Sequence, residues 1–176
     1  MKRLYLLRHA KSEWDAPVTG DFDRPLSRRG HKAARAMGRE MRALGLAFDH
    51  IVASPAARVV ETLEGLAEAW GHDPGAEADP HIYMASASTL LGIVRAAGDE
   101  HQSLMLVGHN PGMEQLALLL TGEGELRDRL AEKFPTAALA EIALPAKHWA
   151  DVAEGRGTLT RFIRPRDLDP ELGPEE

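Results

Sequence analysis

Four side chains suited to phosphate chemistry stand just after short apolar runs in this sequence. An imidazole can attack phosphorus, and a guanidinium can hold phosphoryl oxygens through paired hydrogen bonds. The four are Arg8 and His9 after residues 4–7, Arg58 after residues 51–53, and His109 after residues 104–107. If they converge, two cations and two imidazoles would form a pocket for a phosphate dianion. Such a pocket requires the three runs to be neighbours in the fold.

Each apolar run is predicted to be a β-strand that ends in a turn. Two of the strands continue into Ser54-Pro55 and Asn110-Pro111, a pattern that favours a helix capped by Ser or Asn with proline at its first position. Free N–H groups at a helix N-terminus favour an anion. Because ligands of open α/β sheets bind at the carboxyl ends of the strands, the four side chains are expected to meet at that edge.

Four segments occur in an order typical of one protein family: residues 7–12, 23–30, 54–62 and 107–111. On these segments the sequence resembles the histidine phosphatase superfamily, which shares its fold with the cofactor-dependent phosphoglycerate mutases. Within it, the sequence is most similar to the small SixA-type branch of phosphohistidine phosphatases. The resemblance implies that His9 is the nucleophile that becomes phosphorylated. It also implies that Arg8 and Arg58 grip the phosphoryl group and that His109 donates hydrogen bonds to it.

The side-chain types agree with these roles on physical grounds. Cations beside His9 disfavour the protonated imidazole, and only the neutral ring has a lone pair with which to attack. Phosphoryl transfer depends mainly on alignment and charge neutralisation, so fixed hydrogen-bond donors can supply most of the acceleration. We therefore expect a phosphatase that needs neither a metal ion nor another cofactor.

The proton donor for the leaving group departs from the family pattern. Mutase-like members carry a Glu or Asp before the second histidine, and His81 stands at that position here. His81 is therefore a possible proton donor, with a structural role as the alternative. An imidazole that leaves from phosphohistidine needs less help than an alkoxide, so the missing carboxylate favours phosphohistidine or another activated substrate. Asp15 stands where mutase-like members have Asn, and it is given no role in the site.

Alternating strand and helix patterns predict an α/β fold, a three-layer α/β/α sandwich with a mostly parallel central sheet. Apolar residues at helical spacing predict helices at residues 28–44, 59–70, 90–94 and 113–120, the first of them capped by Ser27. Residues 138–144 and 158–163 are predicted to be strands of an antiparallel edge hairpin.

The chain is expected to be one domain with a short tail. Its 176 residues, 44% of them hydrophobic, are enough for a single core. Residues 1–164 are assigned to that domain. Residues 165–176 are acidic, contain proline and lack periodicity, so we expect a tail that is draped over the surface or disordered.

Composition excludes several classes of protein. The chain has no cysteine, which excludes disulfides, thiolate metal sites and a cysteine-based phosphatase mechanism. A net charge of −6 gives no support to a nucleic-acid partner. No apolar run approaches the length of a membrane span, and a strand pattern begins where a secretory signal would stand. We therefore expect a cytoplasmic protein with no membrane partner.

The remaining histidines and two further cations are less informative. Five histidines lack a chemical motif around them and are interpreted as surface or structural residues: His31, His50, His72, His101 and His148. Lys11 and Arg24 either raise the positive potential at the pocket rim or are ordinary surface charges.

Two other functions stay open on the sequence alone. A phosphoglycerate mutase-type phosphotransferase would isomerise its substrate instead of releasing phosphate, but the short segment between Arg58 and His109 leaves little room for a water-excluding lid. A non-catalytic module would bind phosphate without forming a phosphoenzyme. The substrate, either a phosphorylated protein or a small phosphorylated molecule, and the oligomeric state are not determined by the sequence.

Overall fold

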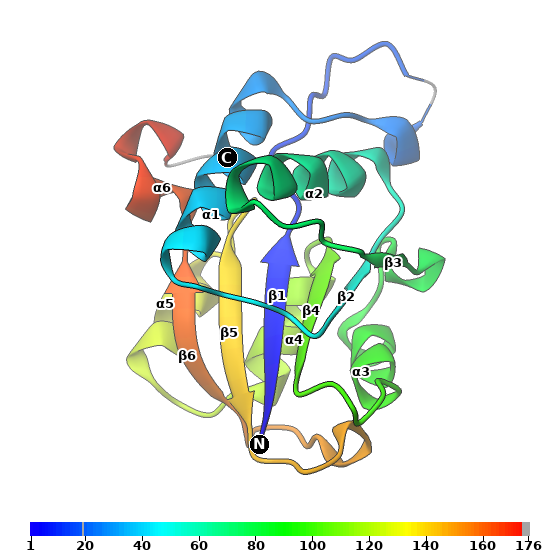
Figure 1. Cartoon of the computed structure of the whole chain (residues 1–176), viewed down its shortest axis with the longest axis vertical. Coiled ribbons are helices and arrows are strands. Elements are labelled where there is room, and N and C mark those ends of the chain that lie inside the picture. Colours follow the sequence, from blue (N-terminus) through cyan, green and yellow to red (C-terminus); the bar gives the residue numbers. More distant parts are fainter. Residues whose placement is uncertain (19, 174–176) are drawn as a thin grey trace.

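The computed structural model describes residues 1–18 and 20–173, and Figure 1 shows a central sheet with helices on both faces. The sheet has six strands in the order β3-β2-β4-β1-β5-β6. They are β1 (Lys2–Arg8), β2 (His50–Ala53), β3 (Glu77–Ala78), β4 (Ser103–Gly108), β5 (Leu139–Leu144) and β6 (Thr158–Ile163). Strands β3, β2, β4 and β1 pair in parallel, whereas β5 and β6 continue the sheet in antiparallel pairs. The mostly parallel sheet with an antiparallel edge hairpin is therefore confirmed.

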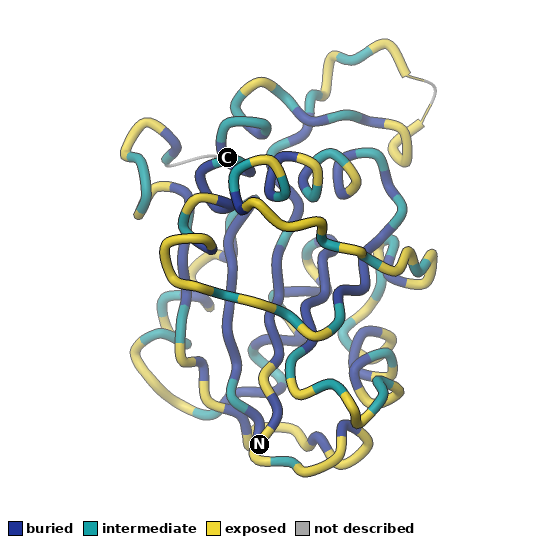
Figure 2. The backbone as a smooth tube through the Cα atoms, in the orientation of Figure 1, coloured by how far each residue is buried: buried dark blue, intermediate teal, exposed yellow. Residues whose placement is uncertain are grey.

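Successive side chains of a strand point to opposite faces, so each central strand supplies two cores. Leu4 and Leu6 pack with the layer of α3, α4 and α5, whereas Tyr5 and Leu7 pack with the layer of α1 and α2. These helices are α1 (Arg28–Ala43), α2 (Ala57–Trp70), α3 (Ala87–Arg95), α4 (Gly112–Leu120) and α5 (Glu125–Glu132). Figure 2 shows the central strands as a continuous buried layer. The predicted three-layer sandwich is confirmed.

Helix α1 begins and packs for reasons visible in the sequence. The Ser27 hydroxyl accepts a hydrogen bond from the Gly30 amide at 3.0 Å, as the predicted cap requires. Small residues let α1 approach α2 closely, because a Cβ added at Gly65 would lie 2.8 Å from the Cβ of Ala34. This close packing fixes the start of α2, which carries Arg58.

Two predicted helix starts are wrong, one by two residues and the other by one residue. Helix α2 begins at Ala57, so Pro55 is not its first residue and Ser54 is not its cap. Instead, the Ser54 hydroxyl accepts from the Ala56 amide at 3.2 Å inside the turn and also bonds to Nε2 of His109 at 2.8 Å. Helix α4 begins at Gly112, with Pro111 one position before it.

Residues 165–173, in the segment expected to be a draped or disordered tail, are ordered and lie against the domain. These residues form α6 (Pro165–Leu168) and a 3₁₀ turn (Pro170–Leu172), and Leu172 is buried. The ammonium group of Lys32 on α1 holds the turn through the Glu171 carboxylate at 2.9 Å. Residues 174–176 lie outside the described residues. The sequence analysis also missed α5 and the two-residue strand β3.

Candidate active site

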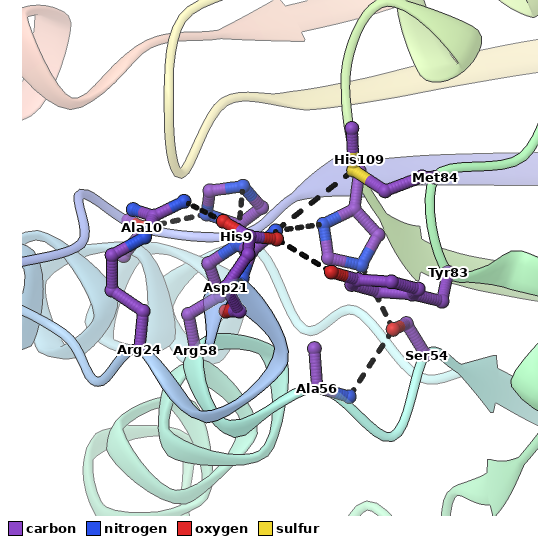
Figure 3. Close-up of polar contacts among 10 residues, drawn as sticks. All are labelled: His9, Ala10, Asp21, Arg24, Ser54, Ala56, Arg58, Tyr83, Met84 and His109. Atoms are coloured by element: carbon purple, nitrogen blue, oxygen red, sulfur yellow. Dashed lines mark hydrogen bonds and ion pairs between the residues drawn. The ribbon is translucent and has the colours of Figure 1, made fainter. Parts of the chain in front are cut away.

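The carboxyl ends of three neighbouring strands place the predicted site residues together. Strand β4 lies between β2 and β1, and its last residues pair with Ala53 and Arg8. His9 and His109 each follow one of these strand ends, and their ring centroids lie 5.2 Å apart (Figure 3). Arg58, in the first turn of α2, reaches both rings. The predicted convergence of these side chains is confirmed.

The ring of His9 is held in one tautomer by the next peptide group. Its Nδ1 lies 2.7 Å from the carbonyl oxygen of Ala10, and a carbonyl only accepts, so Nδ1 carries the proton. The lone pair is therefore on Nε2. This atom accepts a hydrogen bond from Nε of Arg58 at 3.4 Å.

The guanidinium of Arg58 uses two of its edges for different partners. The Nε–Nη2 edge faces the imidazoles, with Nε 3.4 Å from Nε2 of His9 and Nη2 3.3 Å from Nδ1 of His109. The Nη1–Nη2 edge is taken by Asp21, through its carbonyl oxygen at 2.8 Å and its Oδ2 at 2.9 Å. Only 2% of Arg58 is exposed, so this orientation is set almost entirely by protein contacts.

His109 is oriented by a hydroxyl on the far side of its ring. Its Nε2 lies 2.8 Å from Oγ of Ser54, and the Ser54 amide bonds to the Val107 carbonyl at 3.0 Å, next to the end of β4. Because a guanidinium can only donate, Nδ1 of His109 accepts from Arg58, and Nε2 then donates to Ser54. A hydroxyl can also donate, so Ser54 permits the opposite tautomer when a ligand takes the place of Arg58.

A cavity opens onto these groups. Its lining side chains are Arg8, His9, Lys11, Ser12, Trp14, Asp21, Arg24, Arg58, Met84, His109, Asn110 and Thr136. All four predicted core residues of the site therefore contact the same space. Arg8 is anchored by a hydrogen bond from Nη1 to the Phe134 carbonyl at 3.0 Å. Arg24 is buried under Trp14, with its Cζ 3.6 Å from the indole centroid, so it belongs to the cavity wall and is not an ordinary surface charge.

Comparison with known proteins gives the same family that the motifs indicate. The model of the histidine phosphatase superfamily (branch 1) matches residues 4–81. An uncharacterized protein of Mycobacterium tuberculosis is 35% identical over 164 residues, which cover 91% of this chain and 100% of the relative. The SixA protein of Agrobacterium tumefaciens has a similar structure, with a TM-score of 0.78 and 34% identity over 93% of this chain and 97% of that one.

The chain belongs to the histidine phosphatase superfamily. It is of the SixA type and is a phosphohydrolase of that family. The SixA protein of Nakamurella multipartitia has 26% identity and a TM-score of 0.79, over 93% of this chain and 96% of that one.

Burial and charge keep both imidazoles of this histidine phosphatase neutral. Burial is the main cause that lowers the pKa of His9 to about 3. The hydrogen bond to the Ala10 carbonyl opposes this shift, and His109, Arg8 and Arg58 add to it. Burial, followed by the charge of Arg58, lowers the pKa of His109 to about 4. Loss of hydration is therefore a larger cause than the neighbouring cations, from which the sequence predicts the neutral state.

These shifts predict how the stability of the phosphatase depends on pH. The unfolded chain takes up protons on histidine below the ordinary pKa of 6.5, while the folded state keeps His9 and His109 neutral to lower pH. The free energy of unfolding should therefore fall as the pH falls from 6.5 toward about 4. Thermal midpoints measured across this range should fall less steeply for His9→Gln than for the wild type. Equal slopes would contradict the assigned pKa of His9.

Two residues of the site were missed by the sequence analysis. Asp21 lies in a 3₁₀ turn (Asp21–Asp23) and bonds to Arg58, to Arg24 at 2.6 Å and to the Tyr83 hydroxyl at 2.6 Å. The ring of Tyr83 meets that of His109 edge-on at 5.3 Å between centroids. The only signal in the sequence was an acidic residue shortly before the motif at residues 23–30.

His81 is not brought to the site. Its side chain is 80% exposed, and its Nδ1 lies 2.8 Å from Oδ1 of Asp79. It is absent from the residues that line the cavity in the described part of the chain. The 3₁₀ turn Pro80–Ile82 directs His81 outward and Tyr83 inward, so the interpretation of His81 as a proton donor is corrected. The five histidines interpreted as surface or structural also lie outside the cavity lining.

Two negative findings apply to residues 1–18 and 20–173. No group of three or more His, Asp or Glu side chains there is arranged to hold a metal ion. None of the helices in that part of the chain has the length and apolar character needed to cross a membrane.

Proposed function

We propose that the chain is a metal-independent phosphatase that transfers a phosphoryl group to Nε2 of His9 and then to water. One observation carries the proposal: Nε2 of His9 and Nδ1 of His109 face the same edge of the Arg58 guanidinium, at 3.4 and 3.3 Å. A phosphoryl group held at that edge would meet a neutral nucleophile and paired donors at once.

In the first step, the lone pair of His9 Nε2 forms a bond to phosphorus while the bond to the leaving group breaks, and the leaving group keeps the electron pair and takes a proton from water. Arg8 and Arg58 neutralise charge on the phosphoryl oxygens. His109 can donate from Nδ1 once the substrate has taken over the Arg58 N–H, because the Ser54 hydroxyl can then donate to Nε2. In the second step, water attacks phosphorus, the bond to Nε2 breaks, and inorganic phosphate leaves with the proton that water released.

The positive charge that a metal ion supplies in other phosphatases is provided here by side chains. Arg8, Arg24 and Arg58 line the cavity, and Arg58 stands in the first turn of α2, where the helix dipole also favours an anion. Fixed guanidinium groups need no reorganisation when charge develops in the transition state. This supports catalysis without a metal.

The ionised state of the carboxylate in the cavity supports phosphohistidine in a protein as the substrate. A small phosphorylated metabolite is the other candidate. Asp21 is the one carboxylate lining the cavity in the described part of the chain. A hydrogen bond from Tyr83, with others from Arg24 and Arg58, holds its pKa well below the usual range, so it carries no proton to give at neutral pH. The P–N bond of phosphohistidine is weak, so its imidazole can leave without a strong acid to protonate it. The SixA proteins that the chain resembles carry the name phosphohistidine phosphatase. A cytoplasmic location and the lack of a nucleic-acid partner stay predictions.

A comparison of substrates tests this proposal. Wild-type protein and His81→Gln are assayed with a phosphohistidine peptide and several phosphate monoesters, with and without a chelator. We expect faster turnover of the peptide, no effect of the chelator, and equal rates for the variant because His81 points to solvent. Collapse of monoester turnover in His81→Gln would make His81 the donor after all. Loss of activity with the chelator would contradict metal independence.

A further inference from the structure

Asp21 holds the arginine that faces both imidazoles, and no motif accounts for it. Its carbonyl oxygen accepts from Nη1 of Arg58 at 2.8 Å, and its Oδ2 accepts from Nη2 at 2.9 Å. The backbone and the side chain of one residue thus bind one full edge of the guanidinium. Figure 3 shows Asp21 between Arg24, Arg58 and Tyr83.

The geometry of a guanidinium gives this contact its significance. The group is planar and offers two edges that can each bind a partner through two N–H groups. With the Nη1–Nη2 edge engaged by Asp21, only the Nε–Nη2 edge of Arg58 is left for a phosphoryl group, and that edge faces His9 and His109. Without Asp21, the guanidinium could turn about its long side chain and present either edge.

Asp21 is itself fixed from two further sides. The Tyr83 hydroxyl donates to Oδ2 at 2.6 Å, and Nη2 of Arg24 donates to Oδ1 at 2.6 Å. The ring of Phe22 meets that of Tyr83 edge-on at 5.2 Å between centroids, which attaches the 3₁₀ turn to the segment after residue 80. Both carboxylate oxygens are therefore engaged, although 42% of the side chain is exposed.

We propose that Asp21 is a positioning residue, which fixes Arg58 so that its Nε–Nη2 edge meets the phosphoryl group between His9 and His109. The inference rests on the proposed function and adds to it the residue that orients the phosphate-binding arginine. Asp21 acts through Arg58, and it neither bonds to phosphorus nor transfers a proton. Its ionised state suits this role, because a carboxylate is a stronger acceptor for a guanidinium than a protonated acid.

The test compares Asp21→Ala and Asp21→Asn with Tyr83→Phe and with Asp23→Ala, a matched control on the same turn. Steady-state hydrolysis of the phosphohistidine peptide gives kcat and KM, and thermal unfolding reports folding. For Asp21→Ala we expect kcat to fall by about 10- to 100-fold, the usual effect of misplacing a group by an ångström. Asp21→Asn keeps an acceptor for Arg58, so it should recover part of the loss.

Two further readouts separate positioning from a merely structural role. Tyr83→Phe should lower kcat less than Asp21→Ala, and the double variant should be no worse than Asp21→Ala, because both act through Arg58. The charge of Asp21 raises the pKa of His109 and the charge of Arg58 lowers it, so Asp21→Asn, which keeps an acceptor for Arg58, should lower that pKa in an NMR titration. In Asp21→Ala the displacement of Arg58 should offset part of this fall. Asp23→Ala should behave as the wild type.

Three results would overturn the inference. Wild-type kcat in folded Asp21→Ala would show that Arg58 needs no support. Equal losses in Asp21→Asn and Asp21→Ala, together with a lost limb of the pH profile, would mean that Asp21 transfers a proton itself. Additive effects of the Asp21 and Tyr83 variants would mean separate roles. If Asp21→Ala fails to fold, Asp21→Asn and Tyr83→Phe decide the matter. Failure of the proposed function would appear differently, as an inactive wild type.

Discussion

Replacing His9 by alanine is expected to abolish turnover while the domain stays folded. The variant loses the Nε2 lone pair that attacks phosphorus. The other imidazole of the cavity, His109, donates from Nδ1 to the phosphoryl group in the proposed step, so it does not replace the nucleophile. Loss of a nucleophile of this kind lowers kcat by about 10⁴-fold or more. The measurement is hydrolysis of an aryl phosphate and of the phosphohistidine peptide, with circular dichroism and thermal unfolding on the same sample.

The matched control is His72→Ala, which removes an exposed histidine outside the cavity lining. It should keep wild-type rates. An aryl phosphate has a good leaving group, so its hydrolysis needs little from the site besides the nucleophile. Turnover of the aryl phosphate by folded His9→Ala would therefore contradict the assignment of the nucleophile.

Replacing Arg58 by alanine is expected to lower kcat by about 10²- to 10³-fold, the usual cost of removing one preorganised donor to a developing anion. Arg58→Lys should not rescue the rate. An ammonium is a point charge and cannot bind Asp21 on one edge while it offers a second edge to the phosphoryl group. Steady-state kinetics of both variants, with Arg39→Ala on the exposed side of α1 as the control, measures the difference.

The Arg58 variants should also change the pKa of the His109 imidazole. Burial is the main cause of the low pKa of His109, and the charge of Arg58 is the next, so the pKa should rise in Arg58→Ala but stay below 6.5. NMR titration of the ring protons checks this shift. Full activity in Arg58→Lys would mean that Arg58 acts only through its positive charge and that its two binding edges are not needed.

The core of the site could be predicted because each of its residues stands at a strand end or in the helix turn that follows one. Parallel strands present their carboxyl ends at one edge of the sheet, so the positions of His9 and His109 along the chain almost determine their positions in space. The helix that carries Arg58 follows its strand after a short turn. These are local features, and a single sequence contains them.

The outer part of the site could not be predicted because it depends on contacts between loops. Asp21 meets Tyr83, 62 residues later, and neither residue belongs to a periodic pattern. The error at His81 has the same origin. A 3₁₀ turn decides which of two residues, two positions apart, points into the cavity, and sequence spacing alone does not reveal that choice. The strand β3 was missed because two residues are too short for an alternating pattern.

The most direct test of the central claim is to trap the phosphoenzyme. Wild-type protein is mixed with a phosphohistidine peptide or aryl phosphate, quenched in alkali within the first turnover, and digested for mass spectrometry. The account predicts an acid-labile, alkali-stable phosphoryl group on His9, formed and lost at rates that match turnover, and none in His9→Ala. Phosphate release at full rate with no phosphoryl group on His9, or with one on another residue, would contradict it.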